Sequence, residues 1–184
     1  MHQIRRSTLR TLIFGTLRLI LDVVPTFERV DATFFDTAPV IVRASAVIAA
    51  PRDRVFTAIA ADPAGWGRWF PGVDSSGYWA TSGEPGVGSV RVIRAFKVRV
   101  EESILAWDTD ERWAFRIDLT SAAGAPLGKA FAEDYRLSDD GGGTRLDWTV
   151  AMRPALGLKL PVRLLRPSVQ RVLNAAGARL ANVA

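Results

Sequence analysis

One stretch, Arg43 to Gly72, restricts the fold more than any other part of the chain. From Val42 to Ala49, every second residue is apolar, which predicts a half-buried strand. Pro51 follows, and proline is tolerated in the first turn of a helix, where its missing N–H has no partner to lose. The next residues form a short apolar stripe at helical spacing, and Pro63 ends that helix. The stretch therefore predicts a strand and a helix, followed by a loop that carries two tryptophans.

Downstream of this stretch, the chain predicts antiparallel strands and a closing helix. The expected strands are Val73–Thr81, Ser89–Phe96, Val98–Trp107, Arg112–Leu119, Lys129–Leu137 and Thr144–Met152. An apolar stripe from Lys159 to Val183 predicts a long helix, in which Pro167 should cause a kink or mark a fresh start. A curved sheet against one helix seldom packs solid, so we expect a ligand cavity between them.

The order of these motifs resembles a known superfamily. The stretch from Arg43 to Gly72 contains, in this order, a strand and the motifs Ala-Pro, Val-Phe, Asp-Pro and Trp-x-x-Trp-x-Pro. This order resembles the opening of the SRPBCC superfamily, the START-like helix-grip group with polyketide cyclase/dehydrase and lipid-transport members. Further stretches that fit are Pro85–Ser89, Ile104–Trp107, Arg112–Phe115, Phe131–Tyr135 and Thr144–Trp148. The resemblance implies an α+β helix-grip fold from Phe34 onward, with about seven strands wrapped around the C-terminal helix. It does not specify function, because enzymes, carriers and sensors share this scaffold.

Strand alternation predicts which charged side chains face the interior. The apolar face of Phe131 to Leu137 includes Glu133, and the apolar residues of Val90 to Phe96 bring Arg94 inward. Glu102 would lie opposite Arg94 if the hairpin turned near Val98. A buried charge must be paired or must serve a ligand, so these groups form an ion pair that fixes the sheet or contact a ligand.

Aromatic residues complete the expected site. Trp66 and Trp69 either line the mouth of the cavity or pack in the core. The ligand-binding residues predicted from the sequence are Trp66, Trp69, Tyr78, Arg94, Glu102, Trp113, Phe115, Glu133, Tyr135 and Trp148.

The composition excludes several kinds of chemistry. There is no cysteine, which excludes disulfides, thiolate catalysis and cysteine-based metal sites. His2 is the one histidine and lies in a terminus that we expect to be frayed, so Ser-His triads and histidine clusters are also excluded. We therefore expect no metal and no cofactor, and catalytic residues cannot be named. No nucleic-acid motif is present, and we expect no nucleic-acid partner.

Residues 1–33 are interpreted as an added arm, and residues 34–184 as the ligand-binding domain. Apolar residues share one helical face of the arm from Leu9 to Val24, but Arg18 and Asp22 interrupt the run. The uninterrupted apolar part is well short of the ~20 residues that a spanning helix needs, and a signal peptide fits poorly. The helix could dock on the domain or on a second copy, lie on a membrane surface, or act as a weak anchor. The expected location is cytoplasmic, with peripheral membrane contact as an option.

Three functions remain open at this stage. The first is binding of a hydrophobic or amphipathic small molecule, such as a lipid, an isoprenoid or a polyketide-like compound, by a carrier or sensor. The second is an enzyme resembling aromatase/cyclase members, which would have to use carboxylate, tyrosine and arginine groups. The third is an interaction protein that acts through its N-terminal helix.

Overall fold

The structure, a computed structural model, describes residues 27–120, 128–155 and 162–184. Seven strands in the described residues form one antiparallel sheet, in the order β1-β7-β6-β5-β4-β3-β2. The strands are β1 (Val40–Ile48), β2 (Tyr78–Trp79), β3 (Val90–Ala95), β4 (Val98–Asp108), β5 (Arg112–Thr120), β6 (Gly128–Asp140) and β7 (Gly143–Pro154). The helical segments are α2 (Phe34–Thr37), α3 (Arg52–Phe56), the π-helical turn η1 (Thr57–Ala61), α4 (Trp66–Trp69) and α5 (Val162–Leu180).

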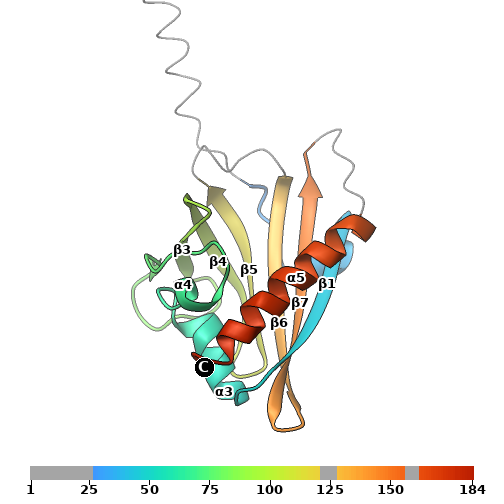
Figure 1. Cartoon of the computed structure of the whole chain (residues 1–184). Coiled ribbons are helices and arrows are strands. Elements are labelled where there is room, and N and C mark those ends of the chain that lie inside the picture. The colour runs from blue at the N-terminus through green and yellow to red at the C-terminus, as the bar shows by residue number, and fades with distance from the viewer. Residues whose placement is uncertain (1–26, 121–127, 156–161) are drawn as a thin grey trace, which may run out of the picture.

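The predicted helix-grip architecture is confirmed. Figure 1 shows α5 crossing the sheet diagonally, with α3 and α4 near its C-terminal end. The strand expected over Val73–Thr81 is shorter than predicted, because β2 spans only Tyr78–Trp79. The predicted N-terminal helix lies outside the described residues. No helix among the described residues is long and apolar enough to cross a membrane.

The segment between β1 and α4 forms as its sequence predicts. Pro51 is extended and precedes α3, and the helical run ends at Asp62, just before Pro63. Phe56 packs edge-on against Trp107 of β4, with the ring centroids 5.6 Å apart. The helical segment is thereby fixed at one end of the sheet.

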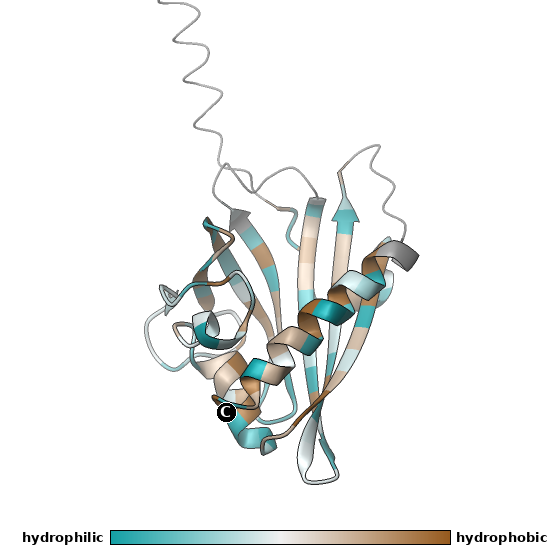
Figure 2. Ribbon diagram, viewed as in Figure 1, coloured by the Kyte–Doolittle hydropathy of each residue, from teal (hydrophilic) through white to brown (hydrophobic). Residues whose placement is uncertain are grey.

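α5 packs with its apolar stripe against the sheet, chiefly over β1. Leu173, Ala176 and Leu180 are buried in the main core, and Figure 2 shows apolar and polar residues alternating along the helix. A side chain at Gly177 would place its Cβ 2.8 Å from the Cδ1 atom of Ile48, so helix and strand are in close contact here. α5 continues through Pro167, so a fresh helix start does not occur there.

A second, smaller core covers the outer face of the sheet. Phe34 and Phe35 of α2 pack against outward-facing alanines of the central strands, namely Ala106, Ala114, Ala130, Ala132 and Ala151. These small side chains leave room for two phenyl rings. The backbone N–H groups of Phe27 and Glu28 donate to the carbonyls of Asp118 and Lys129, at 3.0 and 2.7 Å. The described part of the connector therefore lies on the sheet.

Candidate ligand-binding site

The inward-facing apolar side chains are buried to different extents along the strands. Near α3 and the end of α5, most of them are almost fully buried, although Trp107 stays partly exposed. We call this the sealed half; it contains Trp66, Trp69, Trp113, Leu146 and Leu180. Toward the opposite end, several apolar side chains that pack against the same core stay partly exposed, although Val40, Val100 and Val150 are buried. We call this the open half; it contains Ala95, Val98, Ile117, Phe131, Met152, Leu165 and Val169.

Glu133 lies between the two halves. On β6 it follows the partly exposed Phe131 and precedes Tyr135, which is 1% exposed. Its Oε2 atom accepts hydrogen bonds from the hydroxyl of Tyr135 at 2.5 Å and from Nε1 of Trp148 at 3.0 Å. No donor in the described residues reaches the other oxygen, Oε1. Glu133 faces inward as predicted; its role in binding stays a prediction.

The surroundings of Glu133 raise the pKa of its carboxyl group. Burial raises the pKa of Glu133 to about 7, and the nearby Glu102 acts in the same direction. The hydrogen bonds from Tyr135 and Trp148 favour the ionised form and oppose this rise. Burial, with the adjacent Glu133, raises the pKa of Tyr135 well above its ordinary value, so its hydroxyl remains a donor. The carboxyl group can therefore gain or lose a proton near pH 7.

Arg91 and Glu102 form a buried ion pair close enough to Glu133 to affect its pKa. Their side chains are 0% and 2% exposed, and Nε of Arg91 donates to Oε2 of Glu102 at 2.7 Å. The guanidinium lies 4.3 Å from the ring centroids of both Trp66 and Trp113, and its NH1 donates to the carbonyl of Ile59. Arg91 is thus enclosed by protein groups, although its NH2 atom makes no hydrogen bond.

The prediction that Arg94 faces inward is wrong. Its side chain is 57% exposed and lies 3.9 Å from Asp74. The β3–β4 hairpin turns at Phe96 and Lys97, both with positive φ, so Arg91 pairs with Glu102 and Arg94 with Arg99. Two positive φ angles are typical of the type I′ turn, which normally uses Asn or Gly, and this sequence lacks that signal. Because the hairpin turns before Val98, the face of β3 that points inward carries Arg91, Ile93 and Ala95, and Arg94 lies on the opposite face.

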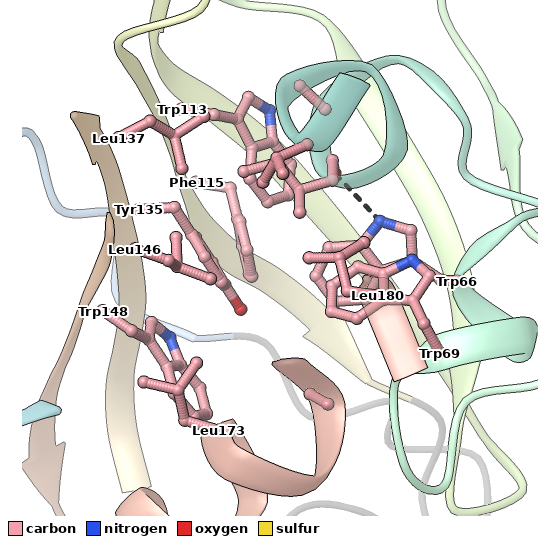
Figure 3. Packing of buried hydrophobic residues seen from close by; sticks show 14 of the residues in the cluster. Trp66, Trp69, Trp113, Phe115, Tyr135, Leu137, Leu146, Trp148, Leu173 and Leu180 are labelled. Carbon is pink, nitrogen blue, oxygen red and sulfur yellow. Dashed lines mark hydrogen bonds between the residues drawn. The ribbon is translucent and has the colours of Figure 1, made fainter. Parts of the chain in front are cut away.

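Six of the predicted aromatic residues come together in the core, namely Trp66, Trp69, Trp113, Phe115, Tyr135 and Trp148. Figure 3 shows the Tyr135 hydroxyl and the Trp148 ring side by side, facing Trp66 and Trp69 across the interior. The rings of Tyr135 and Trp148 are stacked at 5.7 Å. Trp66 and Trp69 pack in the core and do not line a mouth. Tyr78 is separate from this group, because it is 50% exposed.

A hollow of about 320 Å³ lies on the outer face of the sheet, beside α2. Its buried carboxylate, Asp134, is bound by Arg112 at 2.8 Å and by Arg136 at 3.0 Å. Asp147 is paired with Arg145. These charges are satisfied within the protein, so this hollow is a weaker candidate than the interior. In the described part of the chain, no group of three or more acidic, histidine or cysteine residues could hold a metal ion.

Comparison with known proteins identifies the family and supports the helix-grip fold. Residues 39–184 match the family model described as polyketide cyclase/dehydrase and lipid transport. The uncharacterized protein Rv2574 of Mycobacterium tuberculosis is 35% identical over 151 residues, which cover 80% of this chain and 86% of that protein.

Two solved structures share the fold. A START superfamily protein from Mycobacterium smegmatis superposes with a TM-score of 0.62 at 12% identity, covering 78% of this chain and 99% of that one. Ara h 8.0201 superposes with a TM-score of 0.59 at 17% identity, covering 77% and 97%.

Proposed function

The chain belongs to the polyketide cyclase/dehydrase and lipid transport family, and on this premise we propose that it binds an amphipathic small molecule in the open half of its interior. The apolar part of the ligand would lie against residues such as Phe131, Met152 and Val169. Its polar group would lie at Glu133.

The observation that carries this proposal is the contrast between two inward carboxyl groups. Glu102 is neutralised by Arg91 and is only 2% exposed. Glu133 has no cationic partner among the described residues, and its Oε1 atom has no donor there. A carboxyl group that keeps an unused acceptor beside accessible apolar surface has the character of a binding site, in which few polar groups orient a mostly apolar ligand.

An acid–base reaction in the same site is the second candidate. A carboxyl group with a pKa of about 7 is suited to proton transfer at neutral pH. Tyr135 donates to it and would hold its orientation. In that case the compound recovered from the protein would be converted during incubation to a product with a different chromatographic retention or mass, whereas a carrier or sensor would return it unchanged.

The proposal is tested by filling the open half. Val169 of α5 packs against the core and is partly exposed, so Val169→Trp should displace a ligand from the space beside it. Ser168→Trp is the matched control, because Ser168 is exposed on the same helix. Each protein is purified under native conditions, and bound molecules are extracted and identified by mass spectrometry.

We expect a stoichiometric apolar compound in the wild type and in Ser168→Trp, and its loss in Val169→Trp. The same compound at the same occupancy in folded Val169→Trp would contradict the proposal. So would the absence of any bound compound in the wild type.

A further inference from the structure

We propose that the open half selects ligands whose polar group is an amine or a hydroxyl, and that it rejects those that end in a carboxylate or another anion. This inference rests on the proposed function and names the class of ligand that the same site would take.

The charge that faces the interior disfavours an anionic ligand. Among the described residues, the inward charged groups are Glu102, Glu133 and Arg91. Arg91 is 0% exposed, lies against two tryptophan rings and is paired with Glu102, so its guanidinium is not accessible from the open half, although its NH2 atom makes no hydrogen bond. Among the described side chains, an anionic group in the open half would therefore meet an unpaired carboxyl group and no accessible cation.

The helix that closes the interior does not change this balance. Of the side chains of α5 described from Leu165 onward, those packed against the core are apolar, and its arginines Arg166, Arg171 and Arg179 are exposed. Arg94, at the rim, is exposed and lies near Asp74. No described side chain on the inner surface of α5 offers a positive charge to a ligand.

The free hydrogen-bonding positions also favour an amine or a hydroxyl group. Oε2 of Glu133 already accepts from Tyr135 and Trp148, which leaves Oε1 to accept from a ligand. The hydroxyl of Thr120 is buried without a partner, and Thr120 pairs with the core residue Val100 across the β4–β5 ladder. Thr120 is neutral and can donate or accept one bond. An amine or hydroxyl group satisfies these acceptors, whereas a carboxylate has no hydrogen to donate to Oε1.

The net charge of the protein opposes the proposed selectivity. The chain carries a formal charge of +5 at pH 7. Non-specific attraction would therefore favour anionic ligands over cationic ones. A preference for a cation would have to come from the interior.

The experiment compares three amphiphiles with the same chain: dodecylamine, 1-dodecanol and dodecanoate. Each is titrated calorimetrically into the full-length protein at pH 8 and below its micelle-forming concentration. We expect dodecylamine to bind roughly tenfold or more tightly than dodecanoate, with 1-dodecanol between them, because like charges brought together cost binding free energy. At pH 6, where Glu133 is mostly protonated, the difference between amine and carboxylate should shrink.

Glu133→Gln tests whether this carboxyl group is the cause. We expect the preference for the amine to disappear in Glu133→Gln and to remain in Glu111→Gln, the same substitution at an exposed turn residue. Equal or tighter binding of dodecanoate by the wild type would overturn the inference, and so would an unchanged order in Glu133→Gln.

Failure of this inference is distinguishable from failure of the proposed function. If all three amphiphiles bind equally, or none binds while a Val169→Trp-sensitive compound is extracted, the binding function stands and the selectivity is wrong. If none binds and no compound is extracted, both are wrong.

Discussion

Glu133 and Glu102 face the same interior but differ in what surrounds them. Glu102 has a guanidinium partner, and Glu133 has two neutral donors on a single oxygen. Glu102 and its guanidinium partner therefore neutralise each other inside the core. Glu133 remains a carboxyl group that titrates near neutral pH, and this difference between the two residues can be measured.

Replacing Glu133 by Gln should change the pH dependence of stability. The pKa in the folded protein is raised to about 7 from an ordinary value of 4.5. Stability relative to Glu133→Gln is therefore fully present below about pH 4.5 and is lost as the pH rises through about 7. The difference in unfolding free energy should fall by on the order of 1–3 kcal/mol between pH 4.5 and pH 8. Urea unfolding of both proteins measures it, with Glu111→Gln as the control substitution. A difference that stays constant with pH would show that Glu133 is not buried as described.

The Arg91–Glu102 pair should behave as a unit. Arg91→Met or Glu102→Gln alone leaves a buried charge without its partner and should cost about 3–5 kcal/mol. The double replacement Arg91→Met/Glu102→Gln removes both charges and should be less destabilised than either single variant. Chemical denaturation of the four proteins gives the coupling energy directly. Additive losses would contradict a coupled buried pair.

Individual residues differ in how far the sequence predicts them. Glu133 could be placed because its strand has one clearly apolar face, and that face includes it. Arg91 was missed because the apolar residues of β3 lie on both faces, so alternation did not fix the phase. The phase depended on the turn at Phe96 and Lys97, whose residues do not show the usual preference for this backbone conformation.

At the scale of elements, α5 closes the interior through a narrow apolar stripe. Leu173 is 2% exposed, and Leu173→Asp would bury a carboxylate with no partner at the helix–sheet contact. We expect a loss of at least about 3 kcal/mol of unfolding free energy, because an unpaired buried charge is costly. Thermal unfolding followed by circular dichroism measures it. Ala175→Asp, at an exposed position two residues along the helix, should change stability by less than about 0.5 kcal/mol. Similar melting temperatures for wild type and Leu173→Asp would mean that α5 is not part of the core.

The type and order of the helices and strands could be predicted from the sequence where the local sequence signals agree with one another. Pro51 and Pro63 bound the helical segment, and six of the seven strands lie within a few residues of their predicted positions. β2 was overestimated because Val73 is apolar, yet it forms only an isolated bridge with Ala95. A strand at the sheet edge has neighbours on one side only, so its extent depends on pairing that alternation does not record.

At the scale of the whole molecule, the sheet and α5 enclose an interior that is packed at one end and accessible at the other. The packed end comes from large aromatic rings around Arg91 and from the apolar end of α5. The accessible end is lined by smaller or partly exposed side chains, with Glu133 where the two meet. The sequence alone does not show this asymmetry, because alternation gives the face of a residue and not its depth.

The central claim is that a ligand occupies the open half with its polar group at Glu133. The most direct measurement is a crystal structure of the protein purified with the molecule that it retains. The account predicts ligand density beside Phe131, Met152 and Val169, with a donor atom about 2.7–3.2 Å from Oε1 of Glu133. Density confined to the hollow beside α2 would contradict it, as would an interior that holds only ordered water around Glu133.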